Sequence, residues 1–165
     1  MIDLGAGNGN ETVKFRNYFQ NIYATETSRP MQKLLKAKNI TVLPVEKWSS
    51  ENEYDFISCS NLLDRCDNPR DIIEEIKTSL KPNGIVFIAL VLPFEPFVEA
   101  RNSTQPNQSL ALKGSNLEEQ AESFVKLMTE YGFKLKVWTR LPYLCEGDLL
   151  QPVYYLDDAV FLFTL

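Results

Sequence analysis

The sequence Asp3-Leu4-Gly5-Ala6-Gly7-Asn8-Gly9 follows directly on a short apolar start of the chain. Its glycines allow positive φ angles and let a ligand approach the backbone closely. We expect a helix over about residues 10–19, whose first N–H groups would add donors beside the turn. This order of strand, glycine turn and helix is typical of the first crossover in an α/β sheet, although the glycines also suit a plain tight turn.

An acidic side chain stands at the end of the second expected strand. That strand covers residues 22–26, and Glu26 is its last residue. A carboxylate in this place can accept hydrogen bonds from both hydroxyls of a ribose. The glycine turn and the strand-end acid together indicate a cofactor that contains adenosine.

Two residues distinguish between adenosine cofactors. The dinucleotide fingerprint G-x-G-x-x-G requires glycine at its sixth position, where this chain has Asn10. The acid inside the first strand would repel a pyrophosphate, but it suits the ammonium group of an amino acid. The residues therefore favour S-adenosylmethionine over NAD. The expected contacts are Asp3, Gly5, Gly7 and Glu26, with Glu46 as a candidate for the adenine amino group.

Short apolar runs alternate with helical patterns along the rest of the chain, which predicts an α/β sheet. Helices are expected between the first five strands. The last two strands follow each other through a loop, so one of them should run antiparallel. The expected strands cover residues 1–4, 22–26, 40–45, 54–60, 85–92, 133–137 and 153–165.

The helical segments have distinct start and stop signals. Asn68-Pro69 begins one helix with proline at the first helical position, and Pro82-Asn83-Gly84 is expected to end it. An earlier helix should place Met31, Leu34 and Leu35 on one face. Asn116 with Glu119 resembles a capping box. One domain is expected over residues 1–165, with a flexible polar insertion at residues 93–115.

Composition excludes several classes of function. The net charge is −5, so a nucleic-acid footprint is not expected. The chain has no histidine, which excludes the usual zinc sites and histidine-based catalysis, and we expect no bound metal. Its three cysteines form no C-x-x-C pair, which favours reduced thiols. The strongest apolar run, residues 85–92, is far shorter than the about 20 residues that a membrane span needs.

Several longer stretches carry a family resemblance. Together they resemble the DREV-type methyltransferase-like family over essentially the whole chain. The first motif is common among methyltransferases, whereas the two stretches at 61–66 and 140–148 are far more specific. The stretches are 3–7, 23–26, 61–66 (Asn-Leu-Leu-Asp-Arg-Cys), 89–94, 140–148 (Arg-Leu-Pro-Tyr-Leu-Cys-Glu-Gly-Asp) and 154–161.

The resemblance implies a Rossmann-like, seven-stranded class I methyltransferase that uses S-adenosylmethionine. It implies transfer of a methyl group to the N-pros (Nδ1) nitrogen of histidine in His-x-His segments of protein substrates, where x is small. It also suggests the endoplasmic reticulum or the mitochondrion. Family members carry a segment before the first motif, with helices that cover the cofactor. Because this chain starts inside its first strand, we expect a truncated form with weak cofactor binding and little activity.

Site residues follow from the same resemblance. Asp64 would accept from Nε2–H of the substrate imidazole, which leaves Nδ1 free to attack, and Asn61 would orient the cofactor or the ring. Tyr155 could hydrogen-bond the substrate, and Tyr143 is a second candidate wall of its site. The alternatives are that the first two are turn or cap residues and that both tyrosines are packing residues. A methyltransferase of a small metabolite or another side chain, or a non-catalytic binding module, also fits.

Overall fold

The computed structural model describes residues 1–50, 52–98, 105–146 and 152–165. It contains one seven-stranded sheet in the order β3-β2-β1-β4-β5-β7-β6. The strands are β1 (Ile2–Leu4), β2 (Tyr23–Thr25), β3 (Thr41–Leu43), β4 (Tyr54–Ser60), β5 (Leu80–Val91), β6 (Lys134–Glu146) and β7 (Val153–Thr164). The helices are η1 (Thr12–Asn17), α1 (Arg29–Ala37), α2 (Pro69–Ser79) and α3 (Leu117–Glu130).

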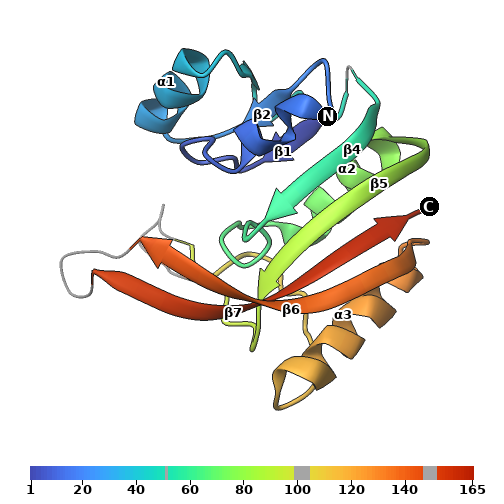
Figure 1. Cartoon of the computed structure of the whole chain (residues 1–165). Coiled ribbons are helices and arrows are strands. Elements are labelled where there is room, and N and C mark those ends of the chain that lie inside the picture. Colours follow the sequence, from blue (N-terminus) through green and yellow to red (C-terminus); the bar gives the residue numbers. More distant parts are fainter. Residues whose placement is uncertain (51, 99–104, 147–151) are drawn as a thin grey trace.

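The strand directions confirm the predicted mixed sheet. The first five strands pair in parallel, and β7 runs antiparallel to both of its neighbours, β5 and β6. Figure 1 shows that β6 and β7 form a long hairpin that extends past the end of β4. The carboxyl ends of β1 and β4 lie side by side because these strands are parallel neighbours. This arrangement is a Rossmann-like sheet with one antiparallel strand.

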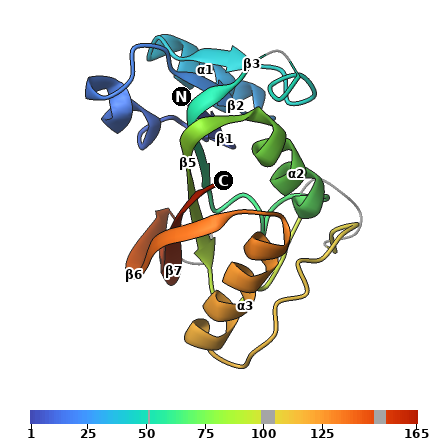
Figure 2. The same ribbon diagram turned by 90° about the vertical axis from the view of Figure 1, so that its right-hand side faces the viewer.

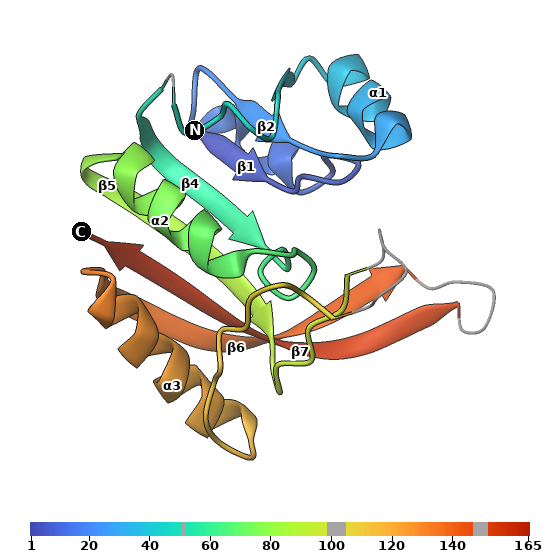
Figure 3. The ribbon, with the colours of Figure 1, turned by 180° about the vertical axis from the view of Figure 1, so that it is seen from behind.

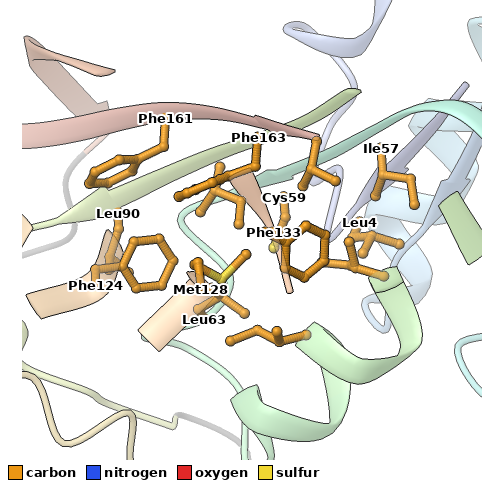
Figure 4. Packing of buried hydrophobic residues seen from close by; sticks show 14 of the residues in the cluster. Leu4, Ile57, Cys59, Leu63, Leu90, Phe124, Met128, Phe133, Phe161 and Phe163 are labelled. Carbon is orange, nitrogen blue, oxygen red and sulfur yellow. The ribbon is translucent and has the colours of Figure 1, made fainter. Parts of the chain in front are cut away.

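Two helices cover one face of the C-terminal half of the sheet. Figure 2 shows α2 and α3 on the same side of the strands, and Figure 3 shows both from behind. Their apolar stripes meet the inward-facing residues of β4, β5 and β7 (Figure 4). Phe124 of α3 packs against Phe161 and Phe163 of β7, with ring centroids 5.1 and 6.1 Å apart. The C-terminal strand is therefore part of the main hydrophobic core.

The elements around β4 and α2 match the sequence patterns closely. β4 has the predicted bounds, and α2 begins with Pro69 at its first turn. Helix α2 ends at Ser79, but β5 already starts at Leu80, which pairs with Tyr54. The register then shifts before Phe56 pairs with Ile85. The segment Pro82-Asn83-Gly84 therefore lies in an irregularity within the strand and does not precede it.

The N-terminal crossovers differ from expectation. The helix predicted over residues 10–19 is only the short 3₁₀ helix η1, because its backbone bonds join residues three apart, as from Lys14 N–H to the carbonyl of Glu11. The described residues between β3 and β4 form turns and no helix. On α1 only Leu35 is fully buried, whereas Met31 and Leu34 are 37 % and 45 % exposed. The buried contact of α1 is that of Leu35, which packs with Ala24 and Ile40.

The segment predicted as a flexible insertion lies partly outside the described residues, which omit 99–104. The remainder contacts the helices. The backbone N–H of Gln108 donates to the carbonyl of Asp67 at 3.0 Å, and its side-chain amide donates to Asp71 at 2.8 Å. Phe94 N–H donates to the side chain of Gln120 at 2.7 Å. The mobility of the segment 93–115 stays a prediction.

The described cysteines Cys59 and Cys66 are free thiols, the first buried and the second half-buried. Burial raises the pKa of the Cys66 thiol to about 12. This thiol is therefore almost entirely protonated, and so a poor nucleophile, at neutral pH. The side chain of Cys145 lies outside the described part of the chain. Within that part, no helix has the length and apolar character that crossing a bilayer requires.

Replacing Phe124 with Ala should destabilise the protein by about 3–5 kcal/mol, because the change leaves a cavity between α3 and β7. Chemical denaturation followed by circular dichroism measures the free energy of unfolding. The control is Tyr18→Ala, since Tyr18 is 79 % exposed and its loss should cost less than about 0.5 kcal/mol. Equal effects of the two changes would contradict the placement of α3 on the sheet.

Candidate functional site

The loops after β1 and β2 meet through the carboxylate of Glu26. Gly7 N–H donates to Glu26 Oε2 at 2.9 Å, and Ser28 N–H donates to Oε1 at 2.7 Å. Gly7 has a φ of +53°, and a Cβ built there would have no neighbour within 4 Å. Gly5 has a φ of +67°, and a Cβ there would lie 2.9 Å from Leu62. Residues other than glycine would be strained at these positive φ angles, and the space next to Gly7 is open.

These residues fit a ribose-bearing ligand. Glu26 is half-buried, and each carboxylate oxygen accepts one backbone bond. A carboxylate oxygen has a second lone pair, so both oxygens can still accept from hydroxyl groups. Gly7, whose Cβ position faces open space, lies next to them. An adenosine-containing cofactor can therefore approach the loop where the sequence pattern predicts it.

Asp3 lies in the centre of β1 and is only 5 % exposed. Its Oδ2 accepts from the Thr12 hydroxyl of η1 at 2.5 Å. Burial raises its pKa, and hydrogen bonds from Thr12 and Ser58 oppose this rise. Asp3 thus ties η1 to the sheet, and its contact with an ammonium group stays a prediction. Sequence reasoning missed both hydroxyls, although Ser58 is the register partner of Asp3.

Glu46, the candidate for the adenine amino group, lies exposed in the turns that follow β3. The structure brings Glu26 and Gly7 into contact through a hydrogen bond. The role of Glu46 stays a prediction.

A second group of polar side chains lies at the carboxyl end of β4. Asn61 follows the strand with a φ of +50°, and its N–H donates to the carbonyl of Ala89 at 2.9 Å. Its side-chain Nδ2 donates to Asp158 Oδ2 of β7 at 3.0 Å. Asp64 is 2 % exposed, and its Oδ2 lies 3.2 Å from Nε of Arg65. Asp64 also lies close enough to Asp158 for its charge to act on that carboxyl. We call Asn61, Asp64 and Asp158 the acceptor cluster.

The acceptor cluster contains oxygens without partners. Among the described residues, the Oδ1 atoms of Asn61, Asp64 and Asp158 are buried and have no hydrogen-bond partner. Burial raises the pKa of Asp64 against the opposing charge of Arg65. Burial also raises the pKa of Asp158, the amide of Asn61 lowers it, and the charge of Asp64 raises it further. Such a site is costly for folding and attracts a ligand that donates hydrogen bonds or carries positive charge.

A pocket of about 390 Å³ lies beside the acceptor cluster. This volume falls within the usual range of about 300–1,000 Å³ for small-molecule sites. Asp64 forms part of its wall, and Val91, the register partner of Asp158, forms another. The lining residues are Asp64, Arg65, Val91, Pro93, Glu95, Pro96, Phe97 and Leu156.

The two predicted tyrosines lie on opposite faces of the hairpin. Tyr143 pairs with Leu156, which lines the pocket, so Tyr143 is on the pocket side. Tyr155 precedes Leu156 in β7 and therefore faces the other way, with 67 % of its surface exposed. The structure brings Asn61 and Asp64 together but does not bring Tyr155 to them. The roles of both tyrosines stay predictions.

Asp158 is the site residue that sequence reasoning missed. The available signal was the pair Asp157-Asp158, which interrupts an otherwise apolar last strand. Asp157 faces the opposite side and pairs with Arg140, whose Nη2 lies 2.6 Å from Asp157 Oδ2. In the part of the chain that the structure describes, no cluster of three or more histidine, cysteine or acidic residues is arranged to hold a metal ion.

Comparison with known proteins places this arrangement in context. The family described as DREV methyltransferase matches residues 1–164. An uncharacterized protein of Methanocaldococcus jannaschii is 24 % identical over 136 residues, which are 81 % of this chain. The chain spans 63 % of the length of that relative.

Solved structures share the fold at low sequence identity. A methyltransferase from Methanosarcina mazei, described as SAM-dependent, has a TM-score of 0.65 and 12 % identity, and covers 98 % of this chain and 90 % of its own. A methyltransferase from Clostridium acetobutylicum, described as S-adenosylmethionine-dependent, has a TM-score of 0.62 and 13 % identity. The match covers 99 % of this chain and 82 % of that one. These likenesses confirm the Rossmann-like class I methyltransferase fold.

Replacing Asp64 with Asn should make the protein more stable at neutral pH. Because the folded-state pKa of Asp64 lies above its ordinary value of 3.8, its contribution favours folding at low pH and is lost as the pH rises through the folded pKa. The Tm of the variant relative to wild type should therefore increase from pH 4 to pH 7, by about 2–4 °C for each 1 kcal/mol relieved.

Differential scanning calorimetry at several pH values measures this difference. The control is Asp55→Asn, because the exposed Asp55 has a pKa lowered by Lys81 and should give no such gain. A Tm difference for Asp64→Asn that does not grow with pH would contradict the buried, charged state of this carboxyl.

Proposed function

This chain belongs to the DREV methyltransferase family, its cofactor is S-adenosylmethionine, and we propose that it methylates the N-pros (Nδ1) nitrogen of histidine in His-x-His segments of proteins. The observation that carries the proposal is the acceptor cluster, with its buried oxygens that lack partners. When bound, S-adenosylmethionine supplies a methyl carbon that the nucleophile takes as the carbon–sulfur bond breaks, which leaves a neutral thioether.

The buried carboxylate suits an imidazole nucleophile. A neutral imidazole carries one N–H and one lone pair, so Nδ1 can attack only when the proton is on Nε2. Asp64 Oδ1 is an acceptor without a partner and can receive that Nε2–H. It would thereby select the reactive tautomer and stabilise the positive charge that develops on the ring, as the orienting carboxylate does in a catalytic triad.

The surroundings of Asp64 favour the same class of nucleophile. Low exposure strengthens the interaction of Asp64 with a developing cation, because little water screens it. Glu95 adds a second acid to the pocket wall, whereas Arg65 already lies against Asp64 Oδ2. A carboxylate or phenolate nucleophile would meet like charge here. The acceptor cluster therefore supports a neutral nitrogen nucleophile whose ring carries an N–H on its other nitrogen.

The glycine turn and Glu26 would hold the cofactor. Replacing Glu26 with Ala should weaken binding of S-adenosylmethionine by about tenfold or more, because hydrogen bonds to a charged group contribute about 1.5–3 kcal/mol. Isothermal titration calorimetry measures the affinity. Glu11→Ala is the control, since Glu11 is highly exposed and pairs with Lys14. An unchanged affinity in Glu26→Ala would show that this carboxylate does not hold the ribose.

The substrate is tested with labelled cofactor and matched peptides. Incubation with a His-Ala-His peptide should label the peptide, whereas an Ala-Ala-Ala peptide should stay unlabelled. The reaction is run with this chain and with a form extended upstream of Met1. Nuclear magnetic resonance of the product should place the methyl group on Nδ1.

Asp64→Ala provides the matched variant for this test. It should lower the rate of transfer by at least about 100-fold while leaving the affinity for S-adenosylmethionine unchanged, because the loss falls on the substrate ring. Labelling of the alanine peptide would favour a different side chain as substrate. Transfer to a small metabolite but to neither peptide would favour a metabolite methyltransferase, and binding of the cofactor without any transfer would indicate a binding module.

A further inference from the structure

We propose that Asp158 is a positioning residue of the transfer site, which holds the carboxamide of Asn61 so that Asn61 Oδ1 serves the substrate as a second acceptor beside Asp64. The inference rests on the proposed function for the identity of the substrate. It is carried by the hydrogen bond from Asn61 Nδ2 to Asp158 Oδ2, at 3.0 Å, between residues 97 positions apart.

The backbone of Asn61 is already fixed, and its side chain needs a separate anchor. Its φ of +50° lies in the left-handed region, which asparagine tolerates better than most residues. The bond from its N–H to the carbonyl of Ala89 holds the main chain at the end of β4. The carboxamide can still rotate, and rotation would exchange the amide donor and the carbonyl acceptor that face the site.

Asp158 can select one of these two orientations. An ionised carboxylate only accepts hydrogen bonds, so it pairs with Nδ2 of Asn61 and not with Oδ1. Once Nδ2 is held, Oδ1 is directed elsewhere, and in the structure it is buried without a partner. Asp64 Oδ1 is in the same state. The cluster therefore offers acceptors for donor groups on a substrate, while the amide donor of Asn61 is already used.

The place of Asp158 in the sheet supports a role beyond folding. It pairs with Val91 of β5 and Leu141 of β6, and it is 6 % exposed. An acid buried between apolar register partners and close enough to Asp64 to feel its charge costs stability. Stability alone would favour an apolar residue at this position. The bond to Asn61 explains why an acceptor stands there.

The experiment compares variants of Asp158 in the peptide assay. Asp158→Ala and Asp158→Leu both remove the acceptor, and Leu keeps a similar shape, so at least one should fold. Each should lower kcat by about 10–100-fold with KM changed less than about threefold, because small misplacements of orienting groups cost up to about 100-fold. Asp158→Asn keeps a carbonyl acceptor for Asn61 Nδ2 and should retain kcat within about threefold of wild type.

Asp157→Ala is the matched control, since the neighbouring acid faces the other side and pairs with Arg140. It should leave kcat unchanged. A second readout is independent of turnover: the side-chain amide resonances of Asn61 in ¹⁵N-asparagine-labelled protein should shift in the Ala and Leu variants and stay near their wild-type positions in Asp158→Asn.

The outcomes separate this inference from the proposed function. If wild type labels the histidine peptide but Asp158→Ala and Asp158→Leu are equally active, the positioning role is wrong. It is also wrong if Asp158→Asn loses as much activity as they do, because the charge itself would then be required. If neither this chain nor the form extended upstream of Met1 labels the histidine peptide, the proposed function fails, and the Asn61 resonances alone decide whether Asp158 holds the carboxamide.

Discussion

The antiparallel pairing of β7 between β5 and β6 holds the C-terminal half of the protein together and builds its candidate site. One face of β7 carries Phe161 and Phe163 into the core under α3. The register that buries these rings also sets Asp158 opposite Val91, at the level where Asn61 follows β4. Because side chains alternate along a strand, a shift by one residue would remove both the aromatic packing and the contact to Asn61.

The acidic side chains at the carboxyl edge of the sheet differ in whether their oxygens have hydrogen-bond partners. Glu26 accepts from the backbone N–H groups of Gly7 and Ser28, so its charge is well compensated. Asp64 and Asp158 are buried, and their Oδ1 atoms have no partner. The first arrangement fits a loop that holds a cofactor, and the second fits a site that awaits a donor. The unpaired acceptors reduce stability at the second, and the proposed transfer reaction would use them.

Local patterns predicted some elements well and others poorly. β4 and the start of α2 have strong signals, namely an apolar run and proline after asparagine. The helix expected after the glycine turn is only the 3₁₀ helix η1 (Thr12–Asn17), and Phe15 of η1 and Phe19 just beyond it pack against Phe56 of β4. The alternating pattern of β6 was recognised only for its first residues, since its extension depends on pairing with β7.

The amino-acid sequence by itself determined the class of fold and the glycine turn with Glu26, because these depend on residue types and on short spacings. It indicated the candidates Asn61 and Asp64 through the family resemblance of residues 61–66. Only the tertiary structure decided that Asp158 joins them, that Tyr155 faces away and that Asp3 is tied to Thr12. Contacts between residues nearly 100 positions apart depend on strand order and register. Those are set by the collective burial of the core, which no local pattern contains.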